Sequence, residues 1–174
     1  TTSADGQGHI RALRHETAGV PLAEAFIKRL TSEAEVRRYV ANMVALHMRP
    51  NVIAQGHPKL KTTNRLFDDS LCPEDLLLLC KADRMGQRKE AGYGPVEDLL
   101  RSRLEAYRET MAKPGVTGKD LVELGFRPGP AFSEALGFAH KLQLAGVEKE
   151  EALSQTKGYL KKYPLLGEGG RPKA

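Results

Sequence analysis

The sequence predicts an all-α protein, a helical bundle followed by a smaller helical region. Apolar residues recur at spacings of three and four through most of the chain, whereas no run alternates apolar and polar residues long enough for a convincing strand. Prolines stand where several periodic segments begin, at Pro73, Pro95 and Pro130, and proline suits the first turn of a helix. With 174 residues, 40% of them hydrophobic, the chain is long enough to bury a substantial core.

The chain starts with a polar, glycine-rich stretch, residues 1–14, that is typical of a loop or a fraying end. From His15 to Leu30 the pattern predicts a helix with one apolar stripe. The segment Ser32-Glu-Ala-Glu35 has the form of a capping box, and it predicts the start of a second helix that Arg49-Pro50 should end.

After a turn-rich connector (51–58) and a short helix (59–69), the stretch Pro73–Gly86 predicts the central helix of the bundle. Four consecutive leucines leave no polar face in its middle, so we expect burial on nearly all sides. Asp83 follows Leu76 at helical spacing and should therefore point into the core. A carboxylate in that position needs compensation from a metal ion, an arginine or solvent.

The second half of the chain divides at a hinge. Residues 95–111 have the pattern of a long helix, and the Pro- and Gly-containing stretch 113–118 has the pattern of a boundary. We therefore expect one domain over 1–113 and a smaller helical region over 114–174. The helices expected in the smaller region cover 119–124, 130–143 and 148–163, and a disordered tail is expected from Pro164.

Composition narrows the functional classes without selecting one. The chain has 27 basic and 22 acidic residues, a net charge of +5 that permits contact with RNA but does not require it. No apolar run is long enough to span a membrane, so we expect no membrane partner and a cytoplasmic location.

Cys72 and Cys80 are expected to be free thiols, with a disulfide between them as the alternative. The chain opens at Thr1 rather than Met, which indicates a piece of a longer protein.

His15, His47 and Asp83 form the first candidate site. Each stands at an end of a predicted helix, on the stripe that should face the core. Two imidazoles and a carboxylate brought together in this way would make a reasonable site for a divalent metal ion. The alternative is that the histidines are satisfied core or rim residues and that Asp83 pairs with an arginine.

The turn Gly125-Phe-Arg-Pro-Gly-Pro130 forms the second candidate site. A helix opened by Pro130 should leave backbone N–H groups near Gly129 free to bind an anion, and Arg127 adds a positive charge beside them. We also expect Gly129 to require a positive φ. Further basic residues that could widen an RNA-binding surface are Lys119, Lys141, Lys161 and Lys162. The alternative is a plain helical corner flanked by ordinary solvated lysines.

Several segments taken together resemble one protein family. They are Arg14-His-Glu-Thr-Ala-Gly-Val-Pro-Leu-Ala-Glu-Ala-Phe-Ile-Lys-Arg-Leu30, Leu46-His-Met-Arg-Pro50, Lys81-Ala-Asp-Arg-Met-Gly86 and Asp120-Leu-Val-Glu-Leu-Gly-Phe-Arg-Pro-Gly-Pro-Ala-Phe132. In order and spacing, the first three resemble the HD domain attached to bacterial CCA-adding tRNA nucleotidyltransferases of the poly(A) polymerase family. The fourth resembles the segment that follows that domain, and the whole resemblance covers about residues 8 to 160.

The resemblance implies an HD-domain-like helical bundle followed by a tRNA-binding region. His15, His47 and Asp83 then fall on the positions of the family's later metal ligands, for an ion such as Mg, Mn or Ni. The family's adjacent His-Asp pair should lie just before residue 8, and no such pair occurs in the sequence. We therefore expect an N-terminally truncated HD domain with an incomplete metal site and without the nucleotidyltransferase head.

Two functional hypotheses follow from the resemblance. The first is a binding module that holds tRNA while the missing N-terminal head adds CCA to the 3' end. The second is a metal-dependent phosphohydrolase, acting as a phosphatase or a 2',3'-cyclic phosphodiesterase through a metal-activated water. A scaffold or dimerisation domain is a third alternative. Whether the chain is an enzyme therefore stays open at this point.

Overall fold

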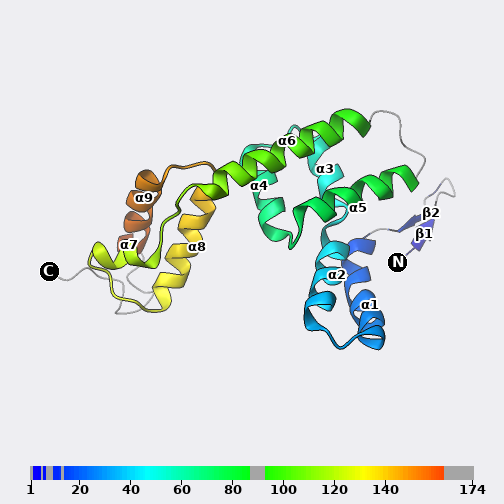
Figure 1. The fold of residues 1–174 in the computed structure, drawn as a ribbon, viewed down its shortest axis with the longest axis horizontal. Helices are drawn as coiled ribbons and strands as arrows, with labels where there is room; N and C mark the ends of the chain where they lie inside the picture. Colours follow the sequence, from blue (N-terminus) through cyan, green and yellow to red (C-terminus); the bar gives the residue numbers. More distant parts are fainter. Residues whose placement is uncertain (1, 5, 7–9, 13, 87–92, 163–174) are drawn as a thin grey trace. The chain divides into compact units, whose positions relative to one another are not determined.

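The computed structural model describes residues 2–4, 6, 10–12, 14–86 and 93–162. The described chain is built from α-helices, as predicted (Figure 1). In order they are α1 (His15–Leu30), α2 (Ala34–Leu46), α3 (Arg49–Gln55), α4 (Leu60–Asp69), α5 (Pro73–Gly86), α6 (Tyr93–Ala112), α7 (Gly118–Glu123), α8 (Pro130–Leu144) and α9 (Lys149–Lys162). The tail expected from Pro164, and most of the loop before α6, lie outside the described residues.

A short hairpin precedes the first helix. Strand β1 (Thr2–Ala4) pairs antiparallel with β2 (Ile10–Ala12), with Ser3 opposite Arg11. The sequence predicted a loop here. Strands of three residues are too short to show the alternation by which a strand is recognised in a sequence, so the pattern could not indicate them.

Most helices begin and end close to the predicted residues, and α1 and α5 match them at both ends. The exception is α3, which occupies most of the predicted connector over 51–58. Helix α2 ends at Leu46, shortly before Arg49-Pro50, but a new helix follows at once. Pro50 lies in the first turn of α3, where its missing N–H would have no partner in any case.

The capping box predicted at Ser32 is not formed. Glu33 precedes α2 without a side-chain cap, and its N–H instead binds the Thr31 hydroxyl at 3.1 Å. A complete capping box is formed at the N-terminus of α7, where the side chains of Thr117 and Asp120 each accept a hydrogen bond from the other's backbone N–H.

The helices form two compact units, which are described separately. Unit 1 comprises residues 1–58 and 65–104, and unit 2 comprises residues 59–64 and 105–174. The predicted boundary at 113/114 lies after this division, which falls inside α6.

The core of unit 1 lies around α4, α5 and α6. Its fully buried members include Leu66, Phe67, Leu76, Cys80 and Leu100. Cys72 and Cys80 are both free, as expected.

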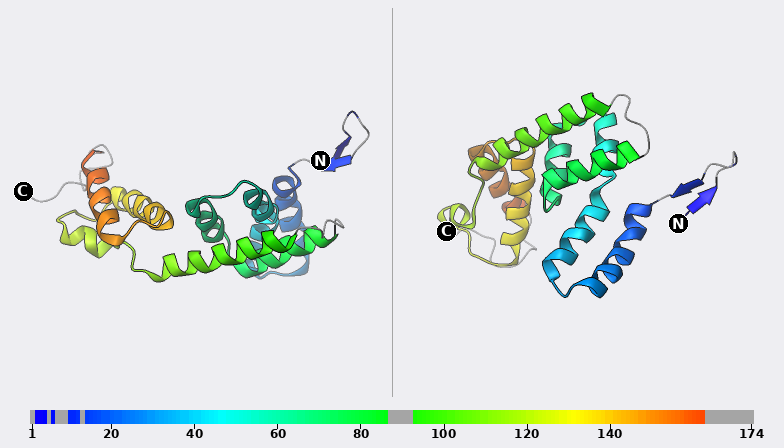
Figure 2. Two further views of the ribbon diagram at one scale, coloured as in Figure 1. Left: turned by 90° about the horizontal axis from the view of Figure 1, so that it is seen from above. Right: turned by 45° about the vertical axis from the view of Figure 1, so that its right-hand side comes forward.

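Two apolar faces predicted to be buried in unit 1 are exposed. On α5, Leu76 is fully buried but Leu78 is 66% exposed, so this helix has one covered face rather than burial on all sides. On α1 no residue is buried, and Leu22, Phe26 and Leu30 all face solvent. The hairpin of α1 and α2 explains this result, because the extensive contacts of α1 with other described helices are made to α2 (Figures 1 and 2). Periodicity shows which side chains share a face, but not whether another element covers it.

Unit 2 has its own core between α7, α8 and α9. The cluster, which we call the unit 2 core cluster, contains Leu121, Phe126, Ala131, Phe132, Ala135 and Leu160. Leu160 is near the end of α9 and Phe132 near the start of α8, so the two helices run antiparallel. The rings of Phe138 and Tyr159 stack between them, with centroids 4.8 Å apart.

Candidate functional site

The imidazoles of His15 and His47 lie side by side in unit 1. His15 is the first residue of α1 and His47 follows the last residue of α2, so the antiparallel hairpin brings the two positions together. Their Nε2 atoms are 3.2 Å apart and their ring centroids 5.2 Å apart. The structure therefore places two of the three predicted ligands next to each other.

Each imidazole has a further polar neighbour besides the other ring. His47 Nδ1 is 2.8 Å from the backbone oxygen of Val44, so Nδ1–H donates to that carbonyl and Nε2 faces His15. On the other ring, His15 Nδ1 lies 3.8 Å from the Glu16 carboxylate. Arg14, which precedes α1, has the left-handed φ of 57°, an uncommon conformation that directs the chain into the helix at His15.

The spacing of the two imidazoles fits two kinds of interaction. It suits an N–H···N hydrogen bond, which satisfies both rings without a metal. It also suits two ligands of one ion, since tetrahedral ligands about 2.0–2.1 Å from a metal lie roughly 3.3–3.4 Å from each other. The Nδ1–H bond of His47 to a carbonyl is the outer contact that metal-bound histidines commonly make.

Asp83, the third predicted ligand, is half-buried on α5. Across the part of the chain that the structure describes, no three His, Cys, Asp or Glu side chains gather closely enough to hold a metal ion. The structure thus assembles two of the three predicted ligands as a pair, and the role of Asp83 stays a prediction.

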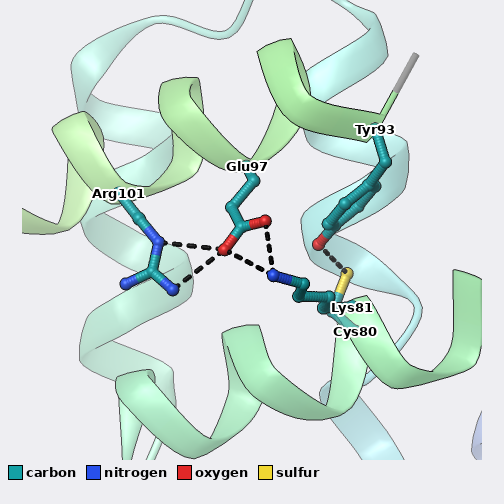
Figure 3. A network of polar contacts seen from close by, with 5 residues as sticks. All are labelled: Cys80, Lys81, Tyr93, Glu97 and Arg101. Atoms are coloured by element: carbon teal, nitrogen blue, oxygen red, sulfur yellow. Dashed lines mark hydrogen bonds and ion pairs between the residues drawn. The ribbon is translucent and has the colours of Figure 1, made fainter. Parts of the chain in front are cut away.

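The residues just before Asp83 have structural contacts instead (Figure 3). Lys81 binds both carboxylate oxygens of Glu97 on α6, at 3.1 and 2.9 Å, and Arg101 binds the same carboxylate. The Lys81 and Arg101 contacts hold the pKa of Glu97 below its usual value. Beside them, the Tyr93 hydroxyl lies 4.0 Å from Cys80 Sγ, and burial raises the pKa of both groups. A buried thiol with a raised pKa is a poor nucleophile, so we interpret Cys80 as a core residue.

The second candidate site is the corner between α7 and α8 in unit 2. Gly125 has a φ of 86°, in the region that favours glycine, whereas Gly129 has a φ of 179°. The expectation that Gly129 needs a positive φ was therefore wrong, because the turn reverses at Gly125 and Gly129 is extended. Gly129 caps α8 without a side-chain hydrogen bond, and its carbonyl accepts from Phe132 N–H at 2.9 Å.

Three of the predicted basic residues lie around the unit 2 core cluster. Arg127 follows Phe126 directly, Lys161 follows Leu160, and Lys119 precedes Leu121 by two positions. All three are exposed, and Lys119 lies 3.8 Å from Glu123. Among the described residues Arg127 forms no ion pair. Each of these cations therefore lies within two residues of a core residue of unit 2 and faces solvent.

The remaining predicted basic residues are placed differently. Lys141 is in the last turn of α8, about 17 Å along the helix from its first residue, given a rise of 1.5 Å per residue. Of Lys162 the structure describes only the backbone, at the end of α9. Two other lysines of unit 2 are occupied by ion pairs, Lys149 with Asp120 at 2.9 Å and Lys113 with Glu148 at 2.6 Å.

One group of basic residues was not predicted from the sequence. Lys28 on α1 and Arg37 and Arg38 on α2 line a groove between the two helices. A signal was present, because basic residues stand on both sides of the short connection that joins two predicted helices.

Comparison of the chain with protein-family models, with curated proteins and with solved structures finds no match. Among the described residues, no helix combines the length and the apolar character needed to cross a membrane. The class that the structure defines is therefore an all-α protein with two compact helical units, one carrying a histidine pair and the other an exposed basic corner.

Proposed function

We propose that the chain is the tRNA-holding helical portion of a cytoplasmic CCA-adding tRNA nucleotidyltransferase, whose polymerising head is a separate N-terminal part. The order and spacing of the four segments that resemble this family support the proposal. A helical bundle followed by a second helical unit agrees with the organisation that the resemblance implies.

The observation that carries the tRNA contact is the basic corner at the start of α8. Arg127 is exposed in the turn, and Gly129 has no side chain that could cap the first turn of α8, where Pro130 has no N–H and Phe132 N–H already binds the Gly129 carbonyl. A phosphate at this position would meet the positive end of the helix and a guanidinium together. Lys119 and Lys161 are exposed cations next to residues of the unit 2 core cluster, and the small Gly129 lets a phosphate approach the backbone.

Binding of a tRNA transcript across a salt series tests this proposal, with Arg127→Ala compared with Lys141→Ala. Losing one phosphate contact should lower the slope of log K against log salt by about 0.7–0.9, and weaken binding at about 0.15 M salt roughly four- to sixfold. Lys141→Ala removes the same charge at the opposite end of α8 and should change both quantities less. Arg127→Ala should leave the melting temperature unchanged, because its side chain is exposed.

Two results would contradict the proposal. One is a wild-type chain that does not bind tRNA. The other is equal affinity and slope in wild type and Arg127→Ala, which would make the corner an architectural turn only.

A second candidate function, the metal-dependent phosphohydrolase, is favoured by the histidine pair. The Nε2 atoms of His15 and His47 would hold the ion, and Asp83 is the predicted third ligand. Imidazole nitrogen suits Ni²⁺ better than Mg²⁺ or Mn²⁺, which favour oxygen ligands. A bound divalent ion would supply an activated water for phosphoester hydrolysis. Because the adjacent His-Asp pair is not in the sequence, we expect little turnover by this chain.

Thermal melts with added Ni²⁺ test the metal site without relying on activity. Binding to the folded state should raise the melting temperature of the wild type, and at 100 times Kd it adds about 2.7 kcal/mol of stability. His47→Ala should abolish the rise, whereas His140→Ala on α8 should keep it. An equal rise in all three proteins would show that Ni²⁺ binds elsewhere. Robust hydrolysis that Asp83→Ala abolishes would make the chain an enzyme in its own right.

A further inference from the structure

The hairpin of α1 and α2 carries a groove that neither candidate site uses. Its volume is about 510 Å³, and its small lining residues are Pro21 and Ala25 from α1 and Ala34 and Ala41 from α2. Because these side chains are short, the space between the helices stays open to a ligand of narrow cross-section.

The charges along the groove are mostly positive. Lys28, Arg37 and Arg38 line it, and the one acidic residue in the lining is Glu24. Among the described residues, none of the three cations forms an ion pair. In an antiparallel hairpin that turns at residues 31–33, Lys28 and Arg37 stand at the same end of the groove.

Other charged residues near the turn lie outside the groove. Glu33 and Glu35 are exposed beside it, as is Arg29, and none of the three contributes to the lining. The positive character is therefore a property of the groove itself rather than of the whole hairpin tip.

We propose that this groove binds the phosphodiester backbone of RNA. The inference rests on the proposed function and adds a second contact surface, on unit 1, to the basic corner of unit 2. Arginine presents a planar fork of donors that matches a phosphate, and two arginines with a lysine complement two neighbouring phosphates. An RNA strand presents phosphates one after another along its backbone, so a single strand can meet the two arginines and the lysine together.

The decisive experiment measures binding of a tRNA transcript across a salt series by the full chain and by Arg37→Gln/Arg38→Gln. If both arginines contact phosphates, the slope of log K should fall by about 1.4–1.8 and affinity at about 0.15 M salt should fall roughly 10–30-fold. The matched control is Lys61→Gln/Arg65→Gln, which removes two exposed charges from α4 outside the groove and should have a much smaller effect.

A second pair of variants tests the groove without removing an arginine. Ala41→Glu places a carboxylate in the lining and should weaken tRNA binding, whereas Ala41→Gln adds similar bulk without charge and should weaken it less. Melting curves of all variants confirm that the chain still folds. Both tests report on the groove even if one substitution disturbs the hairpin.

The outcomes separate this inference from the proposed function. Binding that depends on Arg127 but not on the groove variants would overturn the groove and leave the proposed function standing. No tRNA binding by the wild type would overturn both. If the groove variants lose affinity for poly-glutamate but keep their affinity for tRNA, the partner of the groove is an acidic protein. That result would overturn the assignment to RNA.

Discussion

Single side chains in unit 2 show how local contacts can decide the properties of a charged residue. Asp120 accepts hydrogen bonds from the Thr117 backbone at 2.6 Å and the Thr117 hydroxyl at 2.7 Å, and it pairs with Lys149. The Lys149 contact, followed by those to Thr117, lowers the pKa of Asp120 from 3.8 to about 2. Asp120 therefore caps α7 and joins it to α9, and the ion pair keeps Lys149 from serving as a free cation for RNA.

The depressed pKa of Asp120 predicts a particular dependence of stability on pH. A group with a lowered pKa in the folded state stabilises the fold above its unfolded value, here 3.8, and that stability is lost as the pH falls toward about 2. Asp120→Asn should therefore lower the free energy of unfolding at pH 7 by about 1 kcal/mol, after allowance for solvent screening, and flatten its decline between about pH 4 and 2.

Chemical denaturation at a series of pH values measures this effect. Glu123→Gln on the same helix is the control, since its pair with Lys119 is exposed and longer, at 3.8 Å. An unchanged pH profile in Asp120→Asn would show that the charge of Asp120 contributes nothing to stability.

At the scale of the element, α7 and α8 end in the same way. After α7, Gly125 N–H binds the Val122 carbonyl and Phe126 N–H binds the Leu121 carbonyl, at 2.8 and 3.1 Å. After α8, Gly146 and Val147 repeat the pattern with Gln143 and Leu142, at 2.8 and 3.1 Å. Both glycines have positive φ values, 86° and 81°. These are Schellman motifs, which satisfy the last carbonyls of each helix and require a residue that tolerates the left-handed conformation.

Two glycines of the α8 region should respond oppositely to the same substitution. Gly146→Ala should destabilise the chain by about 1 kcal/mol, because alanine is strained at a φ of 81°. Gly137→Ala, in the exposed middle of α8, should stabilise it by about 0.5–1 kcal/mol, because nothing lies within 4 Å of the added Cβ and alanine favours a helix. Urea denaturation of both variants measures the two changes, and changes of equal sign would contradict the role given to Gly146.

The corner between α7 and α8 also shows what the sequence could and could not predict. Proline and glycine positions predicted the turn, and Pro130 marked the start of α8. They did not show which glycine takes the positive φ, because that depends on which carbonyls the turn must satisfy. The same limit applies to α3, which begins at Arg49 with Pro50 in its first turn, whereas the sequence predicted a connector over 51–58.

Across the whole molecule, the histidine pair was predictable and the covering of apolar faces was not. The helical spacing that puts His47 on the stripe of Met43, together with a neighbouring helix that begins at His15, was enough to predict that the imidazoles meet. Whether Asp83 joins them depends on how α5 packs against the hairpin, which periodicity does not determine. Periodicity also does not determine which apolar faces stay uncovered. Among the described residues, nine exposed large apolar side chains belong to unit 1 and only Val122 belongs to unit 2.

Because unit 1 carries most of this exposed apolar surface, we predict that unit 1 governs the self-association of the chain. Leu22, Phe26 and Leu30 follow one another at i, i+4 and i+8 on α1 and are 71%, 56% and 67% exposed. Replacing all three with glutamine should change the free energy of unfolding by at most about 0.5 kcal/mol per site, since little packing is lost. It should also reduce concentration-dependent self-association, because a contiguous apolar patch is removed from the surface.

Sedimentation velocity over a range of concentrations, with denaturation curves alongside, measures both effects for the triple variant on α1. Leu76→Ala and Leu78→Ala on α5 calibrate the stability scale. The first removes a fully buried side chain and should cost about 2–5 kcal/mol, whereas the second removes one that is 66% exposed and should cost far less. A triple variant as destabilised as Leu76→Ala would mean that the apolar face of α1 is covered in solution within the same chain. Unchanged self-association would instead indicate that the second exposed face of unit 1, around Leu78 and Met85 on α5, mediates it.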